Sequence, residues 1–224
     1  MSAHGTHRRR VRVKICGITH PADALLAADL GADAVGLNFY PGSPRCISTE
    51  VAKDIVHRLP PWVTPVAVVV QPDAALLERL AVEVAIHWVQ IHAGSASVLS
   101  QVVHRLRLHT ILAWGIAGPE DLQALQEEIR TWQSAGVVPR AILVDARVPG
   151  QFGGTGRTAP WSLIGTLTTE LPLVLAGGLD PDNVAQAIRL LRPYAVDVAS
   201  GVEASPGRKD PVLLARFMQA VACA

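Results

Sequence analysis

Polar side chains interrupt the apolar runs of this sequence, and the most reactive ones come where a run ends. Cys16 follows the short β-rich run 12–15, and Asp145 follows the apolar run 141–144. A carboxylate that ends a buried run is seldom placed there for stability, because burying an unpaired charge is costly. A thiolate can remove a proton and a carboxylic acid can supply one. An acid and a base that face one cavity would suit proton transfer within a single substrate.

Both residues also have a structural interpretation. A lone cysteine often serves as a small buried hydrophobe, and Asp145 is also suited to capping or pairing with the glycine-rich loop that follows it. The catalytic interpretation of Cys16 requires a thiolate. Lys14 lies two residues earlier, on the same face of a strand. This cation, together with an adjacent helix N-terminus, is expected to lower the pKa of the thiol.

Further polar residues near predicted strand ends are candidates for binding. Arg45 lies in a loop framed by prolines and a glycine, and its planar guanidinium suits a carboxylate. A solvated surface arginine is the alternative. Gln90 and His92 share one strand face, although a histidine in such a place is often a structural residue. Asp197 interrupts the last apolar run.

Glycine-rich turns occupy the last third of the chain. Their candidate positions are Gly154, Gly156, Gly177, Gly178, Ser200 and Gly201. Bare backbone N–H groups at such turns, ahead of helix N-termini, suit a phosphate. The GGTG segment alone is weak evidence for a dinucleotide site, because it lacks the full spacing of that motif. Together the turns predict an anion cradle built from several loops.

The elements that would position these residues repeat along the whole chain. Apolar, β-rich runs are expected at residues 12–15, 34–37, 66–70, 88–91, 110–114 and 141–144, with two more inside residues 173–203. Helical patterns lie between them. Strand–helix units spaced by about 25 residues predict an α/β fold, a single (β/α)₈ TIM barrel. A doubly wound sheet would carry its glycine-rich turn after the first strand, so the late turns favour the barrel.

The composition limits which folds and which partners are possible. The 224 residues are 50% hydrophobic and 17% charged, which suits one barrel domain over residues 11–224 behind a flexible basic tail, 1–10. A net charge of +1 gives no basic field for nucleic acid or for an anionic membrane. The three cysteines are too scattered for a disulfide framework or a zinc site, and no apolar run is long enough for a membrane span. A cytoplasmic location is expected.

Several segments, in this order, resemble one known family. They are KICGIT, GLNF with SPR, VQIH, VD with GGTG, LAGGLDPDNV, and VDVASGVE with PGRKD. This combination resembles the phosphoribosylanthranilate isomerases of tryptophan biosynthesis, from residue 13 to the end. The resemblance implies a (β/α)₈ barrel that needs no cofactor and no metal. It also implies an Amadori rearrangement of N-(5-phosphoribosyl)anthranilate to 1-(2-carboxyphenylamino)-1-deoxyribulose 5-phosphate.

The resemblance also implies roles for single residues. Asp145 would be the general acid that protonates the furanose ring oxygen, and Cys16 the general base that removes the C2′ proton. Arg45 would hold the anthranilate carboxylate. The six turn positions would hold the phosphate, and Gln90, His92 and Asp197 would lie near the sugar and the aromatic ring. A phosphosugar substrate and a monomer or homodimer are expected.

Some positions depart from the family pattern. Ala93 stands where a glycine is common, Ala199 replaces the first serine of an SSGVE motif, and Pro160 replaces an aspartate. None of these removes the acid, the base or the arginine. Ala199 removes a hydroxyl near the predicted phosphate site.

Other functions remain open at this point. An indole-glycerol-phosphate synthase would be expected to show a lysine–glutamate set, and a metal-dependent epimerase a set of metal ligands; neither is found. The remaining alternative is a barrel without catalysis that keeps its phosphate site as a sensor or scaffold.

Overall fold

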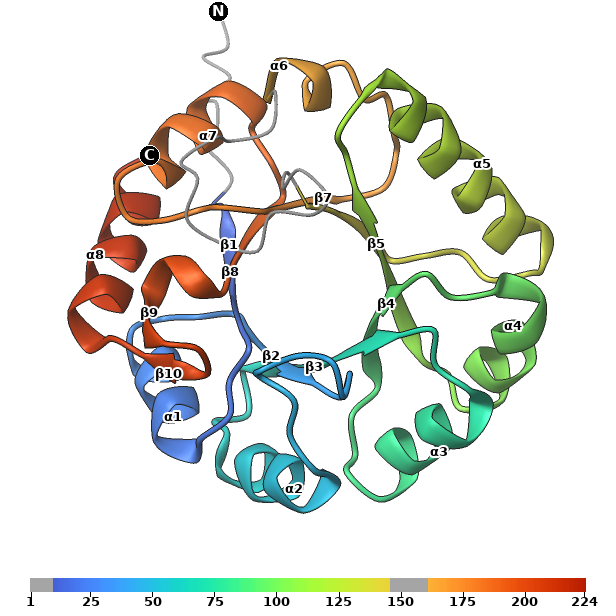
Figure 1. Cartoon of the computed structure of the whole chain (residues 1–224), viewed down its shortest axis with the longest axis horizontal. Helices are drawn as coiled ribbons and strands as arrows, with labels where there is room; N and C mark the ends of the chain where they lie inside the picture. The colour runs from blue at the N-terminus through green and yellow to red at the C-terminus, as the bar shows by residue number, and fades with distance from the viewer. Residues whose placement is uncertain (1–9, 146–160) are drawn as a thin grey trace, which may run out of the picture.

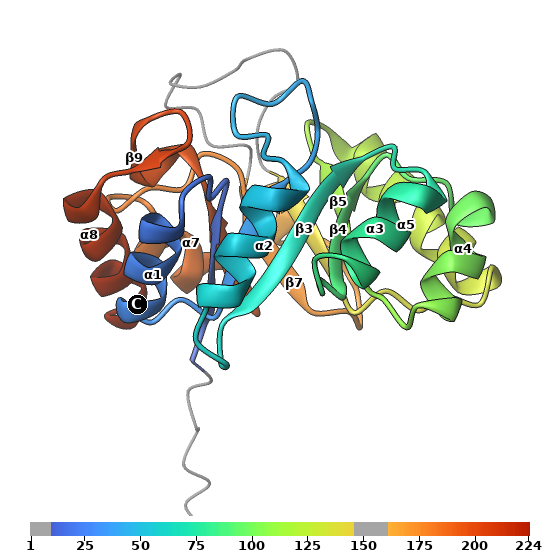
Figure 2. The same cartoon turned by 90° about the horizontal axis from the view of Figure 1, so that it is seen from below.

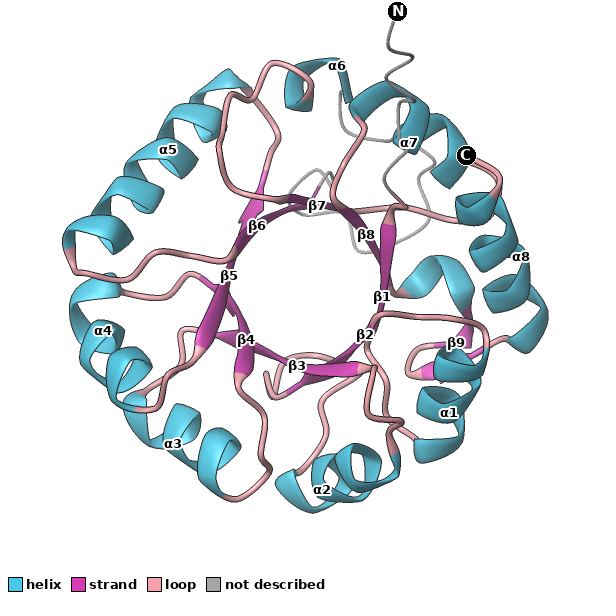
Figure 3. Cartoon of the chain, turned by 180° about the vertical axis from the view of Figure 1, so that it is seen from behind, coloured by secondary structure: helices cyan, strands magenta, loops and turns pink. Residues whose placement is uncertain are grey.

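A closed ring of eight parallel strands forms the centre of the protein, and helices surround it (Figure 1). The computed structural model describes residues 10–145 and 161–224. Each strand pairs with the next along the chain, and the last strand pairs with the first. Figure 3 shows the ring from behind, with magenta strands inside and cyan helices outside. The predicted single (β/α)₈ barrel is therefore confirmed.

The strands of the ring are β1 (Arg12–Cys16), β2 (Ala34–Asn38), β3 (Thr64–Val70), β4 (Trp88–His92), β5 (His109–Gly115), β6 (Ala141–Asp145), β7 (Leu173–Ala176) and β8 (Ala195–Val198). The helices are α1 (Pro21–Asp29), α2 (Thr49–Arg58), α3 (Ala74–Val82), α4 (Ala96–Arg105), α5 (Pro119–Ser134), α6 (Trp161–Ile164), α7 (Val184–Leu191) and α8 (Pro211–Ala222). The short helix η1 (Ser200–Val202) and the hairpin β9 (Glu203–Ser205) and β10 (Arg208–Lys209) lie between β8 and α8.

Some predictions fall outside the described residues. They concern the tail at residues 1–9, the turn positions Gly154 and Gly156, and the departure at Pro160. The hairpin β9–β10 is a difference from the expected architecture, because the sequence after residue 203 was assigned no strand.

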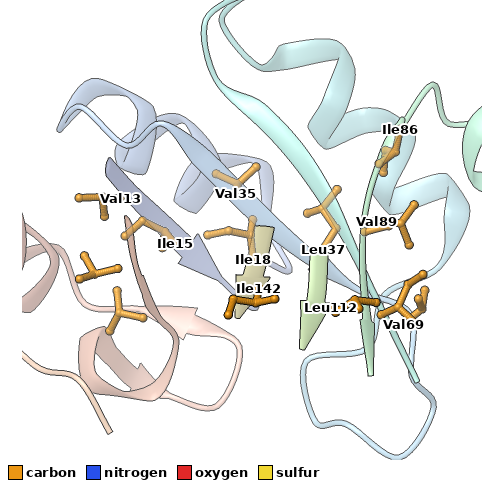
Figure 4. Packing of buried hydrophobic residues seen from close by; sticks show 14 of the residues in the cluster. Val13, Ile15, Ile18, Val35, Leu37, Val69, Ile86, Val89, Leu112 and Ile142 are labelled. Carbon is orange, nitrogen blue, oxygen red and sulfur yellow. The ribbon is translucent and has the colours of Figure 1, made fainter. Parts of the chain in front are cut away.

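Two apolar cores hold the ring in place. The larger one lies between strands and helices, where side chains such as Val35, Leu37 and Val89 are fully buried, and Figure 4 shows part of it. The smaller one fills the inside of the barrel. Its members are Val66, Ile111, Ala113, Ala141, Leu143, Val174, Ala176 and Ala195. Successive residues of a strand point to opposite faces, so both cores draw on the same strands.

The loops at one end of the barrel lie close to one another. Figure 2 shows the loop between β2 and α2 and the β9–β10 hairpin at the same end, where the strands finish. The hydroxyl of Thr19, which follows β1, donates a hydrogen bond to the carbonyl of Gly207 in that hairpin. Loops of a (β/α)₈ barrel at the carboxyl ends of the strands are the ones that carry binding and catalysis.

The turns after β7 and β8 pack directly against each other. Gly177 and Gly178 have φ of +90° and +65°, a region that side chains rarely adopt. Gly201 comes so close to the first of these turns that an added Cβ would lie 1.9 Å from the carbonyl oxygen of Leu179. The chain at residue 201 therefore requires glycine for the close approach of two backbones.

This contact predicts the effect of Gly201→Ala. The methyl group collides with backbone that cannot rotate away, so we expect the free energy of unfolding to fall by about 1–3 kcal/mol, or more, in urea denaturation. Gly115→Ala is the matched control, because a Cβ at Gly115 meets nothing within 4 Å. Equal stability of the two variants would contradict the packing described.

Candidate active site

The pairing of the strands shows which side chains point into the barrel. Residues paired across neighbouring strands point to the same face. Asp145 pairs with Ala176, a member of the inner core, and Cys16 pairs with Gly36, which pairs in turn with Val66 of that core. Cys16 and Asp145 are thus the last residues of β1 and β6, and both face the interior at the same end of the barrel.

A buried ion pair lies beside Cys16. The ammonium of Lys14 donates a hydrogen bond of 2.9 Å to Oδ1 of Asp197, and both residues are buried. The charge of Lys14 also interacts with the thiol of Cys16. Gly36 leaves the room for this group, since a Cβ there would lie 2.8 Å from the sulfur of Cys16 and 2.9 Å from Nζ of Lys14. Asp197, predicted as a binding residue, is therefore the direct partner of Lys14.

The pKa of the Cys16 thiol is raised above its ordinary value. Burial is the largest cause, and the charge of Asp197 acts in the same direction. The cations of Lys14 and Lys209 oppose this shift without cancelling it. Lys14 therefore acts in the expected direction, but burial and Asp197 outweigh it, so the expected net lowering of the thiol pKa was wrong.

Lys14 itself remains a cation at neutral pH. Burial acts to lower the pKa of Lys14, but Asp197 and Cys16 together outweigh burial, and the pKa is raised. The site therefore keeps a fixed positive charge next to the thiol.

Arg45 lies at the same end of the barrel and is held by a carboxylate from the last hairpin. Its Nε donates to Oε1 of Glu203 at 2.9 Å, and its Nη2 donates to Oε2 at 2.6 Å. The sequence-based interpretation of Arg45 as either a binding residue or a solvated surface residue did not include this partner. Glu203 accepts a further hydrogen bond of 2.8 Å from Nζ of Lys209.

Glu203 and Lys209 are the residues that sequence reasoning missed. Burial acts to raise the pKa of Glu203, but hydrogen bonds from Arg45 and Lys209 hold that pKa below its ordinary value. Burial lowers the pKa of Lys209, and Glu203 opposes the shift. The sequence did contain a sign of them: the segment VEASPGRKD, which follows the last glycine turn, carries both of these charged residues within seven positions.

Gln90 and His92 form a pair inside the barrel. Nε2 of Gln90 lies 2.9 Å from Nε2 of His92, a hydrogen bond in which the role of the ring nitrogen depends on the tautomer of the histidine. Gln90 is 2% exposed, so its side chain lies below the rim, where it contacts and orients the ring of His92. Ala93 follows with φ of +52°, the conformation for which glycine is favoured.

The described glycine turns have open space beside their backbone, as a site for an anion requires. A Cβ at Gly178 would meet nothing within 4 Å, and Ser200 is exposed. The amide of Asn183 donates 2.8 Å to the carbonyl of Gly178, which fixes the first turn on the start of α7. Since Gly201 touches Leu179, the two turns form one continuous backbone surface. Gly154 and Gly156 lie outside the described residues.

One cavity in the described part of the chain lies at the other end of the barrel. It has a volume of about 1370 Å³ and is lined by residues such as Leu30, Leu171 and Tyr194, which precede strands or end helices. None of the candidate residues lines it. The arrangement of reactive side chains, and not cavity size, identifies the carboxyl end as the candidate site.

The described ranges contain neither a helix suited to span a membrane nor a cluster of side chains suited to hold a metal ion. Across residues 10–145 and 161–224, no helix combines the length and the apolar character needed to cross a membrane. The same residues contain no group of three or more His, Cys, Asp or Glu side chains suited to hold a metal ion.

Comparison with known proteins gives the family. Residues 13–220 match the model of the N-(5'-phosphoribosyl)anthranilate (PRA) isomerase family. The N-(5'-phosphoribosyl)anthranilate isomerase of Neisseria meningitidis is 41% identical over 210 residues, which cover 94% of this chain and 96% of that protein. The corresponding protein of a Geobacter species is 42% identical over 207 residues, covering 92% of this chain and 96% of that one.

Solved structures agree with this assignment. The crystal structure of phosphoribosylanthranilate isomerase from Thermotoga maritima superposes with a TM-score of 0.84 at 39% identity, and covers 96% of this chain and 100% of that one. A structure of such an isomerase in complex with reduced 1-(o-carboxyphenylamino)-1-deoxyribulose 5-phosphate has a TM-score of 0.79 at 37% identity, with the same coverage. The family match over most of the length, these identities and the shared barrel lead to one conclusion: the chain belongs to the N-(5'-phosphoribosyl)anthranilate isomerase family and is an isomerase.

Proposed function

We propose that this isomerase performs an Amadori rearrangement in tryptophan biosynthesis, by general acid/base catalysis. The substrate would be N-(5-phosphoribosyl)anthranilate and the product 1-(2-carboxyphenylamino)-1-deoxyribulose 5-phosphate. One observation carries the proposal beyond family membership. Cys16 and Asp145 end β1 and β6, and their pairing partners turn both side chains to the inside of the same rim.

The acid acts first. The carboxyl group of Asp145 gives its proton to the furanose ring oxygen, the bond between C1′ and that oxygen breaks, and the anthranilate nitrogen forms a Schiff base with C1′. The Cys16 thiolate then removes the proton from C2′, which leaves an enolamine. The enolamine gains a proton at C1′ and loses the proton of its 2′-hydroxyl to give the ketoamine. Atoms and electrons balance within the substrate, so no oxidant or reductant is needed.

The setting of Cys16 supports its role as the base. A raised pKa means a smaller thiolate fraction at neutral pH, but also a thiolate of higher basicity once it forms. Lys14, held as a cation by Asp197, compensates part of the new negative charge. We therefore infer that Lys14 and Asp197 tune the base, and that Asp197 contacts substrate less directly than was expected.

Both ends of the substrate would be anchored at this rim. The open turns at Gly178 and Ser200 are suited to the phosphate, and the guanidinium of Arg45 to the anthranilate carboxylate. His92, oriented by Gln90, would lie beside the sugar or the aromatic ring. Two anchors orient the reacting bonds, which removes several kcal/mol from the barrier, of the order seen for well-oriented intramolecular reactions.

Several expectations stay predictions. They are the absence of a cofactor and of a metal requirement, the phosphate role of Gly154 and Gly156, the cytoplasmic location, and the state as a monomer or homodimer. A structure of monomers generated from the dimeric enzyme of Thermotoga maritima, which is 35% identical, supports the homodimer as one of the two states.

Substitution of the acid or the base tests the proposal. We expect Cys16→Ser and Asp145→Asn each to lower kcat by about 10²–10⁴-fold while KM changes little, because each removes a group used in proton transfer. The measurement is the loss of phosphoribosylanthranilate fluorescence under steady-state conditions. Cys223→Ser and Asp54→Asn are matched controls, since Asp54 is exposed on α2 and Cys223 is exposed directly after α8, both outside the ring. A kcat near that of the wild type in either test variant would remove that residue from its role.

The pH dependence gives a second test, with opposite signs for two variants. Activity requires the thiolate, so kcat/KM is expected to rise with pH through the pKa of Cys16. Asp197 raises that pKa and Lys14 lowers it. Asp197→Asn should therefore move the rising limb to lower pH, and Lys14→Met should move it to higher pH.

Alkylation of Cys16 by iodoacetamide checks the same shift without turnover. It is measured against pH in a chain that also carries Cys46→Ser and Cys223→Ser, because Cys46 and Cys223 are exposed. Circular dichroism confirms folding, since breaking a buried ion pair costs about 3–5 kcal/mol. Shifts of both variants in one direction would show that these charges do not set the thiol pKa.

A further inference from the structure

We infer that Lys209 and Glu203 are positioning residues that fix the orientation and the net charge around Arg45, and thereby select a substrate that carries a carboxylate. The inference rests on the proposed function, and it assigns a role to two buried residues that the acid, the base and the phosphate turns do not include.

Glu203 is the shared acceptor of this group. Its Oε1 accepts from Nε of Arg45 at 2.9 Å and from Nζ of Lys209 at 2.8 Å, and its Oε2 accepts from Nη2 of Arg45 at 2.6 Å. The Glu203 side chain is 4% exposed, and that of Lys209 is 0% exposed. The guanidinium plane of Arg45 is therefore fixed by two parallel hydrogen bonds that it donates to a buried carboxylate.

Lys209 has no donor left for a substrate. An ammonium group has three N–H donors. Those of Lys209 reach the carbonyl of Cys16 at 2.7 Å, the carbonyl of Ala199 at 3.1 Å and Oε1 of Glu203 at 2.8 Å. Lys209 thus ties the strand end that carries the candidate base to the turn proposed for phosphate, and it acts on a substrate only through Glu203 and Arg45.

The charges of the group explain why a lysine is placed there. A bidentate arginine–glutamate pair is formally neutral and offers little attraction to an incoming anion. With Lys209 the group contains two cations and one anion, so one positive charge remains. Because Lys209 is buried and its three donors are used, the cation of the group that reaches the surface is Arg45, whose side chain is 19% exposed.

The stem of Arg45 is placed by the same strand end. Gly17 follows Cys16 with φ of +74°, and an added Cβ there would lie 2.4 Å from Cδ of Arg45. The arginine stem therefore crosses directly over the end of β1. The contacts of Lys209 with Cys16 and of Arg45 with Gly17 fix the distance between the carboxylate anchor and the base.

Ligand binding by charge variants tests the inference. The probes are reduced 1-(o-carboxyphenylamino)-1-deoxyribulose 5-phosphate and its phenylamino analogue without the carboxyl group, with affinities measured by titration calorimetry. Lys209→Met leaves Arg45 neutralised by Glu203. We expect it to weaken binding of the carboxylated probe by about tenfold and to change binding of the other probe by less than about twofold.

A double variant separates charge from structure. Lys209→Met with Glu203→Gln leaves Arg45 as the only charge of the group, which restores one net positive charge and buries no unpaired carboxylate. The double variant should therefore bind the carboxylated probe more tightly than Lys209→Met alone, and less tightly than the wild type, because the orientation is lost. Lys53→Met is the control, since Lys53 forms an exposed ion pair of 3.6 Å with Glu83.

Each outcome decides the inference. Equal losses of affinity for both probes would show that Lys209 and Glu203 support the site without selecting a carboxylate. A double variant that binds the carboxylated probe no more tightly than Lys209→Met would show that net charge is not the cause. Either result overturns the inference and leaves the proposed function intact. A wild-type protein that binds neither probe and does not turn over phosphoribosylanthranilate would overturn both.

Discussion

The contact on which the site depends is the buried ion pair that crosses the seam where the barrel closes. Lys14 of β1 and Asp197 of β8 are paired in register and joined by a hydrogen bond of 2.9 Å, with 6% and 8% of their side chains exposed. A charge buried without its partner costs about 3–5 kcal/mol, so the pair forms only when both strands are in place and in register. The same lysine lies next to Cys16. The ion pair that joins the first and last strands of the barrel therefore also sets the electrostatic environment of the candidate base.

Two groups of charges meet at Cys16 from different sides. The charges of Lys14 and Asp197 act on the thiol from inside the barrel, and Lys209 donates a hydrogen bond to the main-chain carbonyl of Cys16 from the hairpin. Two cations near a thiol would ordinarily favour the thiolate. Burial and the carboxylate of Asp197 prevail, so the pKa is raised. A raised pKa keeps more of the thiol protonated, and a protonated thiol is less nucleophilic than a thiolate.

The repeated units and the strand ends were predictable from the sequence, because an apolar run followed by a polar residue or a glycine marks the carboxyl end of a buried strand. Cys16, His92 and Asp145 proved to be the last residues of their strands. Two features were not predictable. Arg45 and Glu203 are separated by 158 residues, so no local pattern indicates that they pair. The direction of the thiol pKa results from burial opposing nearby cations, and neither term can be evaluated before the packing is known.

The tie between Lys209 and Cys16 also has a consequence for synthesis on the ribosome. These residues are 193 positions apart, and the carbonyl of Cys16 receives its hydrogen bond from one of the last elements to be made. Contacts of such long sequence separation form late, after the entropy of closing the intervening chain has been lost. A nascent chain can complete most of its strands while the rim still lacks a lysine and a glutamate. The hydrogen bonds of Lys209 to Cys16 and Glu203 are therefore formed only when the polypeptide is nearly finished, and a chain that ends before residue 203 would carry Cys16 without them.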